Sequence, residues 1–253
     1  MQLITPNWPA LPAQVGAFTT TRVGGVSGVP FDDGQGGGGW NFGIRVGDGA
    51  LAVARNRQQL QSLLPGPPVW LHQVHGITVL DAAQAGHEAQ ADASFSTHAR
   101  VVCAVQTADC LPVLFCDHVG SVVAAAHAGW RGLAQGVLQA TVRSMRAIQP
   151  GGAAGAISAW LGPAIGPQQF EVGAEVLAAF DHLPSGRTAF VAHPQHAGKY
   201  LADIYQLARL SLAQVDVLEV AGGEYCTVSQ AQQFYSYRRD QQTGRMVSCI
   251  WIK

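Results

Sequence analysis

Charged side chains are scarce in this sequence of 253 residues, because Asp, Glu, Lys and Arg together make up only 12% of it. The formal net charge is −1, so we expect no basic surface for nucleic acid or for an anionic membrane. No apolar run reaches the length of a membrane span, and the N-terminus lacks the basic start and apolar core of a signal peptide. These absences predict a cytoplasmic protein that binds neither nucleic acid nor membrane.

Cysteines are also few, and their odd number of five does not fit the paired framework of a secreted, disulfide-rich protein. Four of them have no polar partner nearby in the sequence, and we expect small buried hydrophobic residues at Cys103, Cys116, Cys226 and Cys249. His193 and His196 have no nearby acid or thiol in the sequence and are expected to be solvated.

The abundant residue types indicate a compact fold. Apolar residues make up 48% of the chain and 30 glycines are scattered along it, which is typical of a globular protein with many tight turns. Helices are expected over residues 50–64, 131–148, 172–180 and 202–215, and strands over 15–22, 157–161 and 246–252. Because there is no internal repeat and no long linker, we predict one α+β domain spanning residues 1–253, without a regular βαβ alternation.

The stretch from Val101 to Leu133 contains the strongest indication of a functional site. Two short apolar runs typical of buried strands bring Cys110 and His127 to their ends. The segment HQVHG offers His72 and His75, which would face opposite sides of an extended segment, so only one of them would join the site. Zinc binds thiolate and imidazole, and three protein ligands leave a fourth position for water or substrate. The long spacings alone do not separate a metal site from buried structural residues.

Several arginines lie beside glycine turns or at expected helix ends. In a chain with so few charges, one or two of them could form a pocket for an anion, and surface salt bridges are the alternative. The candidates are Arg22, Arg57, Arg131, Arg238 and Arg239.

A series of motifs runs along nearly the whole chain, in the order HQVHG, ADA, TADCLPVLF, AAHAGWRGL, WLGPAIGP, FEVG, YLADI and FYSYRRDQQTGRM. These motifs, in this order, resemble the YfiH family, which is also labelled laccase-like multicopper polyphenol oxidase. The resemblance implies a mixed α/β sandwich similar to that of the cytotoxic necrotizing factor deamidases.

The resemblance also implies a zinc site formed by His75, Cys110 and His127, with copper as an alternative metal. The implied activity is phosphorolysis of adenosine, inosine, guanosine and methylthioadenosine to the base and ribose 1-phosphate, with adenosine deaminase activity besides. Zinc can activate water for attack on C6 of adenine. For phosphorolysis, the cation and a nearby arginine, for which Arg131 is the candidate, could position phosphate against C1′ of the ribose. Asp109 could then assist by proton transfer to the base.

Asn41 and Arg57 match positions at which the family contacts its substrate, and we expect both to bind the purine nucleoside or phosphate. The segment WNFGIRVGD departs from the family pattern, because Arg45 stands in place of a histidine and a glycine-rich loop, residues 34–39, precedes the segment.

Three other functions are compatible with the same residues. Cys110 and His127 could be the nucleophile and base of a cysteine hydrolase that edits peptidoglycan precursors. A copper oxidase acting on phenols could use the same ligand set, but the chain has no His-x-His pair from which a further copper cluster could be built. The site could also be a structural zinc centre in a binding module without enzymatic activity.

Overall fold

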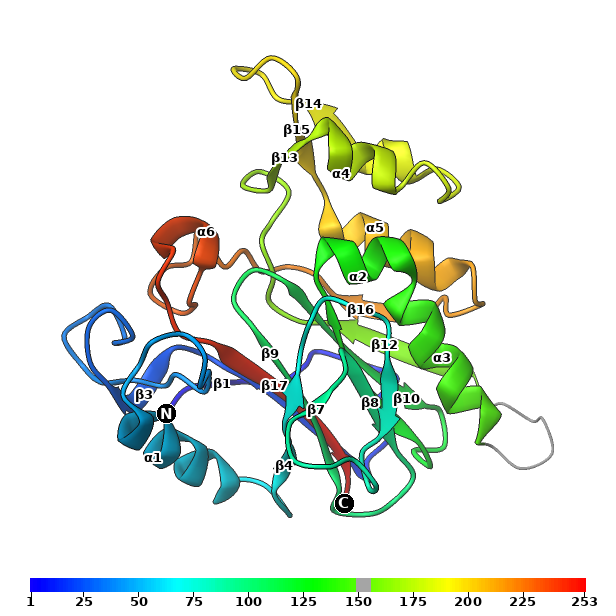
Figure 1. Cartoon of the computed structure of the whole chain (residues 1–253). Coiled ribbons are helices and arrows are strands. Elements are labelled where there is room, and N and C mark those ends of the chain that lie inside the picture. The colour runs from blue at the N-terminus through cyan, green and yellow to red at the C-terminus, as the bar shows by residue number, and fades with distance from the viewer. Residues whose placement is uncertain (149–155) are drawn as a thin grey trace.

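The fold was analysed in a computed structural model, which describes residues 1–148 and 156–253. Two large sheets lie face to face at its centre (Figure 1). The five-stranded sheet has the order β1 (Leu3–Ile4), β2 (Val15–Thr20), β17 (Met246–Ile252), β9 (Val102–Thr107) and β4 (Pro68–Val69). The six-stranded sheet has the order β16 (Val220–Gly222), β12 (Ile157–Leu161), β10 (Leu111–Asp117), β11 (Val123–Ala128), β8 (Ala93–Ser96) and β6 (Val79–Asp81).

Strands β10, β11 and β12 are buried along their whole length, which explains why they appear in the sequence as continuous apolar runs rather than as alternating patterns. One face of the six-stranded sheet packs against the five-stranded sheet through a shared cluster that includes Val105, Leu114, Ala125, Trp160 and Ile250. Helices cover the opposite face. The expected mixed α/β sandwich is therefore confirmed.

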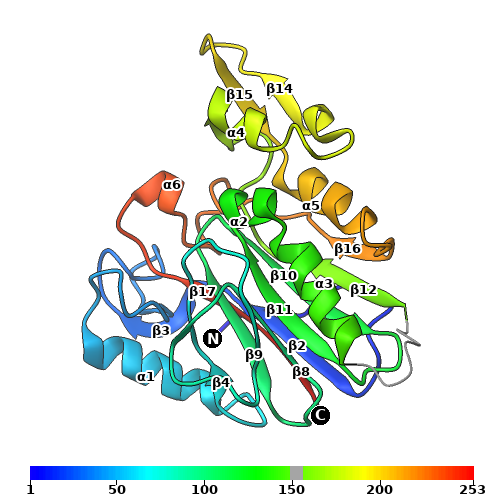
Figure 2. The same cartoon turned by 45° about the vertical axis from the view of Figure 1, so that its right-hand side comes forward.

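Helices form the outer layers of this sandwich (Figure 2). The helices are α1 (Ala50–Gln61), α2 (Trp130–Gln135), α3 (Val137–Ala147), α4 (Ala174–Ala179), α5 (Ile204–Ala213) and α6 (Tyr237–Asp240), with a short 3-10 helix at Gly186–Ala189. The prediction of one continuous helix over residues 131–148 is wrong. Gly136 has φ 95°, a left-handed conformation that ends α2 and allows α3 to start in a new direction.

Smaller sheets complete the fold. The strands β13 (Glu171–Gly173), β15 (Lys199–Ala202) and β14 (Phe190–Ala192) form a three-stranded sheet that, with α4, makes the lobe at the top of Figure 1. The helix expected over residues 172–180 begins only at Ala174, because the residues before it pair with β15. The strands β5 (Leu71–His72) and β7 (Ala89–Gln90) pair in parallel. Among the described residues, no helix is both long and apolar enough to cross a membrane.

The glycine-rich segment before Trp40 is held against β3 (Val23–Ser27) by one side chain of α1. The amide of Asn56 donates to Gly39 O at 3.2 Å and to Asn41 O at 2.8 Å, and its oxygen accepts from Val26 N at 2.9 Å. Asn56 is completely buried, so these backbone groups have no access to replacement water.

We expect Asn56→Ala to lower the free energy of unfolding by about 3 kcal/mol, because the substitution leaves several buried backbone groups without hydrogen bonds. Urea denaturation would measure the change. Gln58→Ala, on the exposed side of the same helix, is the matched control and should change stability by less than about 0.5 kcal/mol. Equal stability of the two variants would contradict this role for Asn56.

Candidate metal centre

The three expected metal ligands come from different parts of the sandwich. Cys110 lies in the turn that connects β9 of one large sheet to β10 of the other. His127 lies on β11, directly opposite Pro112 of β10. His75 follows β5 and has φ 62°, so HQVHG is a turn at this point and not the extended strand assumed from the sequence. The argument that separated His72 from His75 by strand face therefore does not apply.

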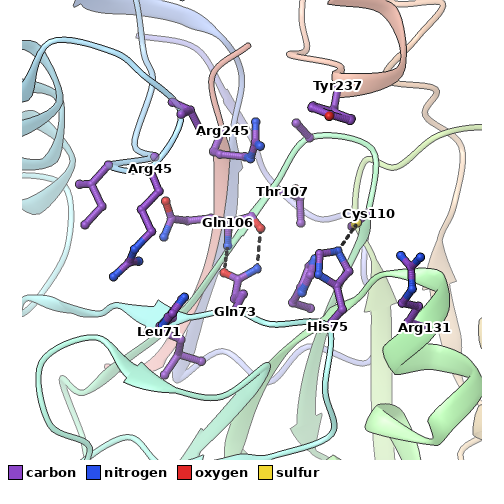
Figure 3. Close-up of a pocket in the computed structure, with 16 residues that line it drawn as sticks. Arg45, Leu71, Gln73, His75, Gln106, Thr107, Cys110, Arg131, Tyr237 and Arg245 are labelled. Carbon is purple, nitrogen blue, oxygen red and sulfur yellow. Dashed lines mark hydrogen bonds between the residues drawn. The ribbon is translucent and has the colours of Figure 1, made fainter. Parts of the chain in front are cut away.

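The structure brings these three side chains together (Figure 3). One ligand atom from each lies within 4.8 Å of the others, and the Cys110 Sγ is 3.6 Å from Nε2 of His75. The imidazole rings of His75 and His127 meet edge to face, with centroids 4.8 Å apart. A thiolate and two imidazoles in this arrangement suit a transition metal with one position left for water or substrate.

A buried carboxylate positions both histidines. Asp92 Oδ1 lies 2.8 Å from Nδ1 of His127, which directs the other ring nitrogen toward Cys110. The same carboxylate accepts hydrogen bonds from the backbone N–H groups of Val74, His75 and Gly76 at 2.7–3.1 Å. Burial would raise the pKa of Asp92, but the bonds from His127 and from this backbone lower it. Sequence reasoning assigned no role to Asp92, although the ADA motif marks it.

Glycine allows the close approach of α2 to this cluster. A Cβ at Gly129 would lie 2.5 Å from Cδ2 of His75 and 3.1 Å from Sγ of Cys110. A Cβ at Gly132 would lie 2.9 Å from the carbonyl oxygen of Gly76. The two glycines of AGWRG are therefore needed for packing at the site.

The cluster also alters proton affinities in the absence of a metal. Burial would raise the pKa of the Cys110 thiol, but the adjacent His127 and His75 lower it to about 6. Burial would lower the pKa of His127, but Cys110 and Asp92 raise it to about 9. Between these values the metal-free site holds a thiolate next to an imidazolium.

The cluster opens into a cavity of about 560 Å³ that sixteen residues line. Arg131 lines it, together with two arginines to which the sequence analysis gave no binding role, Arg45 and Arg245. Gln106 and Tyr237 also face the cavity, and no aspartate or glutamate is among the sixteen residues. The sequence signals for Arg245 are its place directly after the turn at Thr243–Gly244 and within the motif FYSYRRDQQTGRM.

The other two expected substrate-binding residues are not among the residues that line the cavity. Asn41 is completely buried, and its Oδ1 accepts hydrogen bonds from the backbone N–H groups of Gly43 at 2.9 Å and Arg245 at 2.8 Å. Arg57 stacks over the ring of Trp70 at 3.9 Å and reaches Glu88 at 3.5 Å. Both residues support neighbouring parts of the site.

Asp109 does not line the cavity either. Its Oδ1 accepts a hydrogen bond from the hydroxyl of Thr227 and its Oδ2 accepts one from the backbone N–H of Arg238, each at 2.6 Å. The residue has φ 87°, so its carboxylate extends away from the cluster while its neighbour Cys110 faces it. These contacts join the TADC turn to α6.

The remaining candidate arginines bind backbone oxygens. Arg22 donates to the carbonyls of Asp32 and Ala231, Arg238 donates to that of Gln169, and Arg239 donates to those of Thr227, Val228 and Phe234. None of these three lines the cavity described above.

His193 and His196 are not simply solvated as expected, because folding brings Glu171 to them. The Glu171 carboxylate lies 2.5 Å from Nδ1 of His196 and 3.4 Å from Nε2 of His193. The Nδ1 of His193 accepts two backbone N–H groups of its own turn, from Gln195 and His196. Since that nitrogen is an acceptor, a neutral His193 carries its proton on Nε2, the ring nitrogen on the Glu171 side. These bonds tie the β14–β15 turn to β13.

Three of the four remaining cysteines are buried as expected, at positions 103, 116 and 249. Burial raises the pKa of Cys103 and of Cys116 to about 12. Cys226 differs, because it is partly exposed and its sulfur accepts hydrogen bonds from Gly166 N and Ser229 Oγ.

Comparison with known proteins gave consistent matches over the whole chain. Residues 16–253 match the family described as multi-copper polyphenol oxidoreductase laccase. The chain is 51% identical to the purine nucleoside phosphorylase YfiH of Escherichia coli, with 99% of each chain covered. It is 43% identical to a purine nucleoside phosphorylase of Haemophilus influenzae, with full coverage of both.

Two solved structures are similar to the fold described here. A Neisseria meningitidis protein superimposes with a TM-score of 0.90 at 46% identity and full coverage of both chains. YlmD from Geobacillus stearothermophilus gives a TM-score of 0.85 at 30% identity, covering 97% of this chain and 94% of that one.

If the cluster binds a metal, we expect Gly129→Ala to lower the metal affinity by about tenfold or more, because the added methyl group displaces the His75 ring. Metal titration followed by elemental analysis would measure this. Gly49→Ala is the control, since a Cβ there meets nothing within 4 Å and its φ is −63°. Unchanged metal affinity in Gly129→Ala would contradict the need for close approach.

In metal-free protein, alkylation of Cys110 should become half-maximal near pH 6, because the fraction of thiolate sets the rate. In His127→Ala the midpoint should move upward, since burial remains while a neighbouring cation is lost. Iodoacetamide labelling across pH, followed on the Cys110 peptide by mass spectrometry, would test both. A wild-type midpoint near pH 9 would show that the histidines do not stabilise the thiolate.

Proposed function

Because the chain belongs to the multi-copper polyphenol oxidoreductase laccase family, whose bacterial relatives are named purine nucleoside phosphorylases, we propose that it is a purine nucleoside phosphorylase. Its substrates would be adenosine, inosine, guanosine or methylthioadenosine together with phosphate. The observation that carries this proposal is one cavity that combines a metal-ligand cluster with three arginines and no carboxylate. Such a lining favours an anion beside a metal site.

We propose zinc as the metal, held by His75, Cys110 and His127. The donor set of one sulfur and two ring nitrogens suits zinc, and the Asp92–His127 contact is the support that metal-bound histidines commonly have. When bound, zinc would supply a Lewis acid at the cavity wall. Copper could occupy the same ligands, but among the described residues the only other group of suitable side chains is the Glu171 cluster, which lacks the additional histidines of a multicopper centre.

In the proposed reaction a phosphate oxygen bonds to C1′ of the ribose while the C1′–N9 bond breaks. The bonding electrons remain on the purine, which takes up a proton. Holding phosphate and nucleoside together in one cavity supplies much of the rate enhancement, because two reactants are already oriented. Arg131 at the start of α2 would help to hold phosphate, and the amide of Gln106 and the ring of Tyr237 are available to the base.

Asp109 would act as a positioning residue that holds the TADC turn, since both of its carboxylate oxygens already accept hydrogen bonds. Adenosine deamination would be a second activity of the same cavity. The Cys–Cys–His signature of the zinc nucleobase deaminases is absent from the sequence, so this activity would rest on a different arrangement.

One observation favours a second candidate function. Cys110, His127 and Asp92 follow one another in contact, which is the order of nucleophile, base and orienting acid in a cysteine hydrolase. Metal binding separates the two functions, because a zinc-bound thiolate is protected from iodoacetamide while a free nucleophile is alkylated.

We expect zinc-loaded protein to convert adenosine to adenine only when phosphate is present, and Cys110→Ala to reduce the rate at least about 100-fold. Chromatographic separation of the products, with and without phosphate, would measure this. Cys226→Ala is the matched control, since Cys226 is a partly exposed cysteine that does not line the cavity. Inosine as the sole product would make the protein a deaminase. No product in either condition, with a readily alkylated Cys110, would favour the hydrolase.

A further inference from the structure

The three arginines that line the cavity differ in how their charges are balanced. Arg45 is about half exposed and lies 2.7 Å from the carboxylate of Glu88. Arg131 is exposed and stacks on the ring of Trp130 at 4.4 Å. Arg245 is neither exposed nor paired, because within residues 1–148 and 156–253 no carboxylate lies within 4.0 Å of its guanidinium.

The hydrogen bonds of Arg245 leave part of its guanidinium available. Nη1 donates to the carbonyl oxygens of Thr243 and Gly244, each at 3.0 Å. In the described part of the chain, Nε and Nη2 of Arg245 donate to no protein acceptor. Arg245 lines the cavity, where a partly buried guanidinium without an acidic partner is suited to binding an anion. Burial lowers the pKa of Arg245, while Cys110, Asp109 and Tyr237 oppose this change.

Hydrogen bonding of its backbone and packing of its side-chain stem also hold Arg245 in place. Its backbone N–H donates to Oδ1 of Asn41 at 2.8 Å, and Nδ2 of Asn41 donates to Oδ2 of Asp48 at 2.8 Å. The stem of the side chain packs closely against the chain at Gly43, where a Cβ would lie 2.9 Å from Cγ of Arg245. The guanidinium is therefore prepositioned before any ligand arrives, which reduces the entropy lost on binding.

We propose that Arg245 is the main residue that binds the phosphate co-substrate, and that Asn41 is a positioning residue which acts through the backbone of Arg245. This inference rests on the proposed phosphorylase function. Figure 3 shows Arg245 on the Tyr237 side of the cavity, with Cys110 and His75 farther along the same space. The planar guanidinium can donate to two phosphate oxygens at once, and no carboxylate among the cavity-lining residues competes for it.

Steady-state kinetics of Arg245→Gln and Arg245→Lys would test the role in catalysis. We expect Arg245→Gln to raise the KM for phosphate about 10- to 100-fold and Arg245→Lys to raise it less, with the KM for adenosine within about twofold of wild type. Asn41→Ala should raise the KM for phosphate by an intermediate factor. Arg55→Gln, on the exposed side of α1, is the matched control and should leave both constants unchanged.

Binding of inorganic phosphate to the zinc-loaded protein, followed as a rise in Tm, provides a readout independent of turnover. We expect phosphate to raise the Tm of wild type and of Arg55→Gln, and to have little effect on Arg245→Gln. If Arg245→Gln does not fold, Arg245→Lys is expected to show a reduced rise. A phosphate-dependent rise that Arg245→Gln abolishes, without phosphorolysis by wild type, would support the anion site while rejecting the proposed function.

Two outcomes would overturn the inference while the phosphorylase stands. The first is an unchanged KM for phosphate and an unchanged Tm rise in both Arg245 variants. The second is a Tm rise with adenosine monophosphate that depends on Arg245 when inorganic phosphate gives none, because Arg245 would then bind the phosphate of a nucleotide.

Discussion

The carboxylate of Asp92 is the contact on which the arrangement of the candidate metal centre depends. Two candidate ligands that are far apart in the sequence, His75 and His127, are both positioned by this one group, through a backbone N–H for His75 and a ring nitrogen for His127. Asp92 has no exposed surface, so water does not compete for these bonds. Gln73 ties the start of the HQVHG turn to the backbone of Gln106 on β9, and Asp92 adds the link from His75 to His127 on β11.

A similar arrangement is found elsewhere around the cavity. Acidic side chains that do not line the cavity hydrogen-bond to residues and turns next to it. Asp92 holds the histidines, Asp109 holds the TADC turn, and Asp48 holds Asn41, whose oxygen in turn fixes Arg245. Each of these carboxylates accepts hydrogen bonds from other groups of the protein. The surface of the cavity therefore keeps a positive character although the chain as a whole carries a net charge of −1.

The sequence predicted those parts of the site that lie on strongly patterned strands. Cys110 and His127 end apolar runs that are buried on both faces, so the fold class and two of the three grouped candidate residues follow from local pattern. The third candidate, His75, did not follow from local pattern, because its backbone is left-handed and strand periodicity does not describe it. The family resemblance suggested it instead. Arg245 escaped prediction because its place at the cavity depends on the pairing of β17 with strands far away in the sequence. Asn41 matches a family position but does not line the cavity, because it is completely buried and hydrogen-bonds to the backbone of Gly43 and Arg245.

The place of β17 has a consequence for how the molecule is made. This strand is the last in the chain, yet it lies in the middle of its sheet between β2 and β9, and Ser248 hydrogen-bonds to Thr19 across 229 positions. Contacts of such long range form slowly and need both partners to be present. During synthesis on the ribosome, the sheet that supports β9 and the turn after it stays incomplete until the final strand emerges. The candidate metal centre therefore takes its final geometry only after β17 has paired, because a chain without β17 leaves the facing edges of β2 and β9 unpaired.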